Sequence, residues 1–92
     1  MTVLEKDDLK ASLEVAGITE QLAMIAMHVD EIEAEGERVL DLVIALRSAG
    51  RHADQVRAQD ALVDLAVSLE HLCDHAAHLV PALQRRFGIG DA

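Results

Sequence analysis

Two long series of apolar or small residues, repeating at alternating spacings of three and four, constrain the fold of this chain more than any other sequence feature. The first series consists of Val15, Ile18, Leu22, Ile25, Val29, Ile32, Gly36, Val39, Val43 and Leu46. The second consists of Leu62, Leu65, Leu69, Leu72, Ala76, Leu79 and Leu83. A mean spacing of about 3.5 residues places every member of a series on one side of an α-helix, as in a left-handed bundle or coiled coil. The sequence therefore predicts two long amphipathic helices.

The link between the two series is short and contains Gly50, which suits the left-handed residue just past the C-terminus of a helix. A short link makes consecutive helices antiparallel neighbours. We therefore expect an antiparallel helical hairpin, with long helices over about residues 18–48 and 53–80. Strand signals are nearly absent, so the predicted fold class is all-α.

The ends of these helices depend on residues that interrupt helical geometry. Thr2 and Glu5 form a capping-box pattern, which predicts a short N-terminal helix over about residues 3–15. Gly17 predicts a kink or a break after it. Pro81 predicts that the second long helix kinks there or ends near Leu79, with a last turn over about residues 81–87. The whole chain, residues 1–92, is expected to be a single helical domain.

The apolar surface of the two helices is wider than a two-helix contact can cover. Leu40 and Ile44 lie beside the first series, and Ala66 and Cys73 lie beside the second. A chain of 92 residues has a small core, and its single cysteine allows no disulfide within the chain. We therefore expect a homodimer or higher oligomer with the architecture of a four-helix bundle. The residues expected at its core or interface are Leu22, Ile25, Val29, Ile32, Val39, Val43, Leu62, Leu65, Leu69, Leu72 and Leu79.

The charge of the chain argues against several classes of partner. The formal net charge is −9, and residues 1–46 carry eleven acidic residues against three basic ones. Such a field repels nucleic-acid phosphates and anionic membranes, so neither is an expected partner. The acidic run Asp30–Glu37 is interpreted as a solvated helix face, or alternatively as a patch for a basic protein. The N-terminal residues lack the pattern of a secretory signal, and a lone cysteine suits a reducing compartment, so the expected location is cytoplasmic.

Histidines in the second helix raise the alternative of a metal site. His71, His75 and His78 are spaced so that their imidazoles fall on one stripe of a helix. Their counterparts in the first helix are His28, Glu31 and Glu35. Histidine pairs four residues apart can bind a divalent transition metal, and bundles build such sites from facing helices. The simpler interpretation is a stripe of histidines that points away from the leucine series and faces solvent.

No pattern in the sequence indicates a catalytic reaction. Glycine-rich phosphate loops, nucleophile elbows and zinc cysteine patterns are all missing, and Cys73 is flanked by acidic residues that disfavour a reactive thiolate. The expected function is protein–protein interaction, as a small scaffold, adaptor or regulator. The alternatives are a metal-binding bundle that uses the histidine stripe and, more weakly, an acidic inhibitor that mimics DNA.

Overall fold

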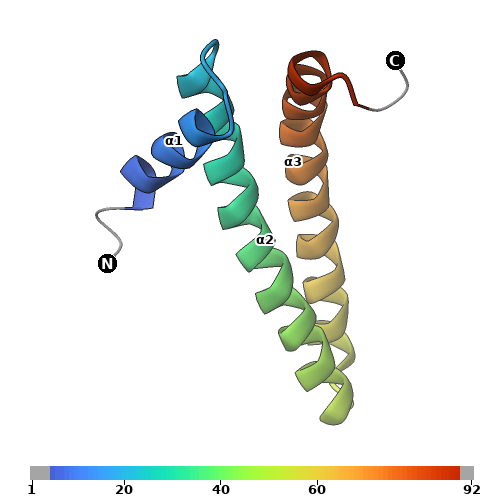
Figure 1. The fold of residues 1–92 in the computed structure, drawn as a ribbon. Helices are drawn as coiled ribbons and strands as arrows, with labels where there is room; N and C mark the ends of the chain where they lie inside the picture. Colours follow the sequence, from blue (N-terminus) through green and yellow to red (C-terminus); the bar gives the residue numbers. More distant parts are fainter. Residues whose placement is uncertain (1–4, 90–92) are drawn as a thin grey trace. The chain divides into compact units, whose positions relative to one another are not determined.

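Three α-helices make up almost all of the chain that the structure describes. The structure is a computed structural model that describes residues 5–89, with side chains from Leu9 onward (Figure 1). The helices are α1 (Glu5–Val15), α2 (Leu22–Arg51) and α3 (Gln55–Phe87), and the described residues contain no strand. The all-α class and the two long helices packed against each other are therefore confirmed. None of these helices has a stretch long and apolar enough to cross a lipid bilayer.

The break between α1 and α2 is set by Gly17. The Gly17 N–H donates to the Glu14 carbonyl and the Ile18 N–H to the Leu13 carbonyl, at 2.9 and 3.0 Å, which is the hydrogen-bond pattern of a Schellman cap. The cap requires positive φ at Gly17, whose φ is +93°. The chain is therefore not helical through this point, and α2 begins at Leu22 instead of near residue 18. Val15 consequently falls outside the first series and is 89% exposed.

The turn between α2 and α3 uses the same cap, but at Ala53 instead of the expected Gly50. The Ala53 N–H donates to the Gly50 carbonyl and the Asp54 N–H to the Ala49 carbonyl, at 3.1 and 2.8 Å. Gly50 lies inside α2, and Ala53 carries the positive φ of 53°. The Asp54 side chain then caps α3 by accepting a hydrogen bond from the Arg57 N–H at 3.1 Å. The expected end of the first long helix at residue 48 was therefore three residues short.

Exchanging these two residues is expected to stabilise the protein. Alanine is the better helix former at position 50, where an added Cβ would meet no atom within 4 Å. Glycine at position 53 removes the strain of a left-handed alanine. The double variant Gly50→Ala, Ala53→Gly should raise the free energy of unfolding by about 1–2 kcal/mol, measured by urea denaturation at fixed protein concentration. A double variant no more stable than the wild type would contradict this assignment of the turn.

Pro81 does not interrupt α3, which runs unbroken from Gln55 to Phe87. Proline removes one main-chain donor and strains the preceding turn. The segment is held in place by burial on both sides of the proline, because Leu79 and Ala82 are both buried. Of the two alternatives expected at Pro81, a kink or an end of the helix near Leu79, the second is therefore wrong.

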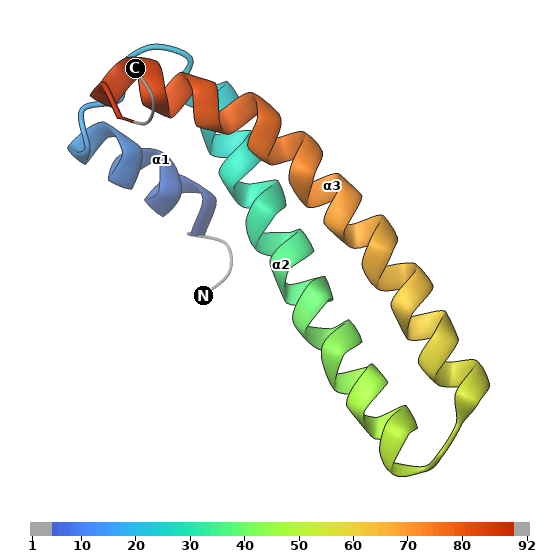
Figure 2. The ribbon, with the colours of Figure 1, turned by 90° about the vertical axis from the view of Figure 1, so that its right-hand side faces the viewer.

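The described residues group into two compact units. The first, called the three-helix unit, combines α1 and the start of α2 with the end of α3, within Met1–Glu31 and His75–Ala92. The second, called the hairpin unit, is Ile32–Asp74 and contains the turn between α2 and α3 (Figure 2).

The three-helix unit has its core around Ile18 and Ile25, which are each only 2% exposed. Ala26, Leu79 and Ala82 complete the buried apolar residues of this unit. Arg86 ties the end of α3 to the turn after α1. Its Nε and Nη2 atoms donate to the Gly17 carbonyl at 3.0 and 2.7 Å. A Cβ on Gly17 would lie 2.8 Å from Arg86 Nη2, so glycine at this position also makes room for the guanidinium.

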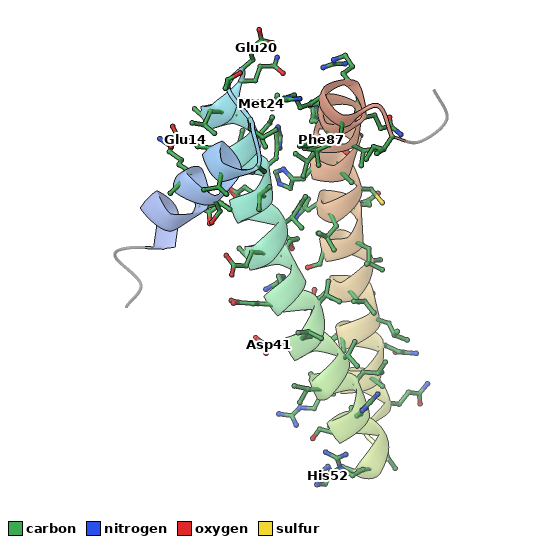
Figure 3. All side chains as sticks on the ribbon, in the orientation of Figure 1. Glu14, Glu20, Met24, Asp41, His52 and Phe87 are labelled. Carbon is green, nitrogen blue, oxygen red and sulfur yellow. The ribbon has the colours of Figure 1, made fainter. Side chains whose placement is uncertain are left out.

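In the hairpin unit, the α2 side of the helix contact is the one that the sequence indicates. The contact residues, called the α2 seam, are all partly buried: Ile32, Gly36, Val39, Val43 and Leu46. The residue Asp41 of the same helix points away from α3 (Figure 3). The first apolar series therefore gives the correct face of α2 from Ile32 to Leu46.

The α3 side of the contact differs from the expected leucine series. The α3 seam consists of residues that are at least partly buried: Ala58, Ala61, Leu65, Ser68 and Leu72. Leu62 and Leu69 are 51% and 45% exposed, so neither belongs to the core of the single chain. Small residues at positions 61 and 68 allow the two helices to approach closely, which the bulkier leucines would prevent. The placement of Leu62 and Leu69 at an interface between copies stays a prediction.

Candidate functional site

The histidines expected to share one stripe of α3 are divided between the two units. In the hairpin unit, His71 Nδ1 lies 3.4 Å from Glu35 Oε1, with the His71 side chain half-exposed and that of Glu35 mostly buried. In the three-helix unit, His75 and His78 of α3 lie against His28 of α2. Glu31, also expected to take part, is exposed.

His28 is the centre of the histidine cluster in the three-helix unit. It is buried, and its Nδ1 atom lies 3.1 Å from the Nδ1 atom of His75, within hydrogen-bond distance. Its ring also stacks on the ring of His78, with centroids 5.2 Å apart and planes inclined by 8°. Because one Nδ1 must donate and the other accept, the two bonded imidazoles share a single proton at this contact. The pair therefore joins α2 to α3 by a part-buried polar contact.

The expectation that all three α3 histidines point away from the helix contact was wrong for His75. Position 75 continues the spacing of the α3 seam, because it lies three residues after Leu72 and four before Leu79. Its side chain is accordingly partly buried, whereas His71 and His78 are exposed on the flank. The sequence spacing does place His75 in the helix contact, but only when the α3 seam is taken to include Ala61 and Ser68 instead of Leu62 and Leu69.

The geometry gives no support to a metal centre at these residues. Among the residues that the structure describes, no group of three or more His, Cys, Asp or Glu side chains is arranged to hold a metal ion. The imidazoles of His28, His75 and His78 do gather, but those of His28 and His78 are in ring-stacking geometry, which directs their faces at each other and not their nitrogen lone pairs at one point. The proposed ligands Glu35 and His71 form a separate pair in the other unit.

Two buried polar atoms in the hairpin unit have no hydrogen-bond partner, Glu35 Oε2 and Ser68 Oγ. Ser68 is completely inaccessible to solvent and lies in the α3 seam. A buried hydroxyl without a partner destabilises the fold, so the small size of serine, and not its hydroxyl, suits it to this contact.

The surface has open hollows in both units. A hollow in the three-helix unit has a volume of about 440 Å³ and is lined by the turn before α2 together with Arg85 and Arg86. The one in the hairpin unit has a volume of about 380 Å³ and lies between Leu42, Ala45 and Ser48 of α2 and Asp60 and Asp64 of α3. Neither has the enclosed apolar walls with a few convergent polar groups that are typical of a small-molecule site.

The most distinctive surface of the described chain is apolar. In the hairpin unit, Leu40 and Ile44 of α2 are 64% and 62% exposed, and Leu62 and Leu69 of α3 are about half-exposed. Val56, Val63 and Val67 of α3 are exposed as well.

No family model, curated protein or solved structure matches the chain.

Proposed function

We propose that this protein is a small homo-oligomeric helical bundle that acts by protein–protein interaction, as a scaffold, adaptor or regulator. The observation that supports this function is the row of large apolar side chains left exposed on the hairpin unit, led by Leu40 and Ile44. Exposed apolar residues that cluster on one face are typical of interaction surfaces, whereas single scattered ones are not.

The composition of the core supports self-association. Four of the seven buried apolar residues of the described chain are alanines, which bury little apolar area each. A chain of this length with such a core is expected to be marginally stable alone. Covering Leu40, Ile44, Leu62 and Leu69 with another chain would bury the large side chains that the fold itself leaves in water.

This function predicts that thermal stability depends on protein concentration. When unfolding separates the copies, mass action favours the folded oligomer at high concentration. Raising the protein concentration from about 5 to about 500 µM should raise the melting temperature by roughly 5–10 °C. The measurement is a series of melts followed by circular dichroism. A melting temperature that is the same across this range would contradict the proposal.

A further inference from the structure

One exposed column of α2 has acidic residues at one end and basic residues at the other, placed at equal distances from its centre. The column, called the α2 stripe, consists of Glu33, Glu37, Leu40, Ile44, Arg47 and Arg51. All six residues are exposed and lie in the hairpin unit. Their spacings of four, three, four, three and four residues keep them on one side of the helix. Two acids therefore stand at one end, two arginines at the other, and two large apolar residues between them.

When two copies of the α2 stripe lie antiparallel, each charged residue faces one of opposite charge and each large apolar residue faces another. If a second α2 lies antiparallel, with its centre level with residue 42, Leu40 meets the partner's Ile44. In the same register Glu37 meets the partner's Arg47, and Glu33 meets the partner's Arg51. A twofold axis repeats these contacts, so four opposite-charge pairs flank an apolar centre. The chain has a net charge of −9 and would otherwise repel its own copies.

A matching column runs along α3. The α3 stripe consists of Gln55, Gln59, Leu62, Ala66, Leu69 and Cys73, which have the same spacings, are all exposed and carry no formal charge. When two copies of the α3 stripe lie antiparallel and centred on position 64, Leu62 faces the partner's Ala66. A large residue then packs against a small one, as close helix packing needs. Farther from the centre, Leu69 meets the partner's Gln59. The methylene groups of that glutamine can cover the leucine while its amide stays in water at a polar rim.

The two stripes lie on the same side of the hairpin. From Glu33 to Arg47 and from Gln59 to Cys73, each stripe residue directly follows a seam residue, which is a rotation of about 100° round the helix. In two antiparallel right-handed helices that face each other, this rotation leads to the same side of the pair. The residues that precede the seam residues lie together on the other side. There Glu35 pairs with His71, and Leu42 and Ala45 share a hollow with Asp60 and Asp64.

The centres of the two stripes also lie at the same level. The contact between Glu35 and His71 fixes which residues of the two antiparallel helices are level with each other. Counting seven residues toward the turn from each brings α2 to Leu42 and α3 to Asp64. These two positions line the same hollow and are the centres of the two stripes. One twofold axis can therefore pass through both.

We propose that this face, made of the α2 and α3 stripes, binds the same face of a second copy about a twofold axis perpendicular to the helices. α2 then lies antiparallel to the partner's α2, and α3 lies antiparallel to the partner's α3. The inference rests on the proposed function and specifies the partner, the surface and the register. A face about 30 Å long and 20 Å wide buries roughly 1,200 Å² in total, the lower end of stable interfaces.

The charged pairs set the orientation of the two copies more than their affinity. They lie at the rim of the face, where solvent weakens each pair. A parallel arrangement would place Glu33 and Glu37 against the same residues of the partner, and the arginines likewise. Like charges across an interface disfavour that arrangement strongly, as in the pairing of coiled coils.

A pair of charge-reversed variants tests the register. Glu33→Arg with Glu37→Arg makes all four charges of the α2 stripe positive, and Arg47→Glu with Arg51→Glu makes them all negative. Each variant alone should dimerise more weakly by a factor of about 100 or more at low ionic strength. An equimolar mixture should dimerise again, because every pair across the twofold axis is then of opposite charge. The matched control for the positive variant is Asp60→Arg with Asp64→Arg, which changes the net charge by the same amount on the opposite side and should stay dimeric.

A cysteine placed opposite Cys73 tests the register independently. Gln55→Cys should form a disulfide with the partner's Cys73 on oxidation and give a covalent dimer. The wild type should give little, because the two Cys73 residues would lie roughly 27 Å apart along the helices. Asp60→Cys, on the opposite side, is the control that should not cross-link above the wild-type level.

The outcomes separate this inference from the function it rests on. A wild type that dimerises, with charge-reversed variants that also dimerise or a mixture that does not, would overturn the proposed face and register but leave self-association standing. A Gln55→Cys variant that cross-links no better than Asp60→Cys would overturn the register. A wild type that is monomeric at every concentration would overturn both proposals.

Discussion

Replacing Ser68 with Asp is expected to unfold the hairpin unit, whereas the same replacement at the next residue, Leu69, should leave its helices formed. Ser68 has no exposed surface, so an aspartate there would bury a carboxylate without a partner in a contact that also lacks room. That cost is several kcal/mol, comparable to the whole stability of a small domain. Leu69 is 45% exposed in the single chain, so its replacement costs the helix contact little.

Two measurements should distinguish the two variants, one of helix content and one of molecular mass. Circular dichroism at low temperature should show most of the helical signal lost in Ser68→Asp and retained in Leu69→Asp. Light scattering should show Leu69→Asp as a monomer, because the carboxylate lies in the α3 stripe. Helicity lost equally in both variants would contradict the assignment of Leu69 to a position outside the helix contact.

Truncating Ile25 to Ala is expected to cost about 2–5 kcal/mol of unfolding free energy. Ile25 is 2% exposed and lies at the centre of the three-helix unit, where its removal leaves a cavity that the surrounding helices fill only in part. The matched control is Met27→Ala on the same helix. Met27 is 48% exposed, so this change should cost less than about 1 kcal/mol. Urea denaturation at one protein concentration gives both values, and equal losses would place the core of this unit elsewhere.

The sequence predicted the helices and the face of α2 well because α2 has a single apolar column. From Ile25 to Leu46 every member of that column is at least partly buried. α3 has two candidate columns that share Leu65, Leu72 and Leu79. Hydrophobicity favours the column that contains Leu62 and Leu69. Close packing of the two helices favours the column that contains Ala61 and Ser68. Spacing in one helix cannot decide between them, since the choice depends on the shape of the other helix.

The ends of the helices were less predictable because caps depend on several main-chain hydrogen bonds at once. Gly17 follows the rule that glycine takes the left-handed position. Ala53 does not, because the position of the turn is set by the Asp54 cap of α3 as well as by the end of α2. Pro81 was misleading for a related reason, since burial of its neighbours outweighs the one hydrogen bond it removes.

The histidine site could be predicted only in part. His75, His78 and His28 do meet, but through a hydrogen bond and ring stacking. His71 and Glu35 meet separately. The grouping of the three α3 histidines assumed that steps of four and three residues keep one direction, whereas position 75 turns toward the helix contact and positions 71 and 78, seven residues apart, turn toward its flank.

Sedimentation equilibrium of the untagged wild-type protein measures self-association most directly. The chain has a mass of 10.0 kDa, so the twofold assembly predicts about 20 kDa at concentrations well above the dissociation constant. On dilution the mass should fall toward that of one chain, at the concentrations where the melting temperature also falls. A mass of one chain up to millimolar concentration would contradict self-association and leave the apolar face of Leu40, Ile44, Leu62 and Leu69 without a second copy to cover it.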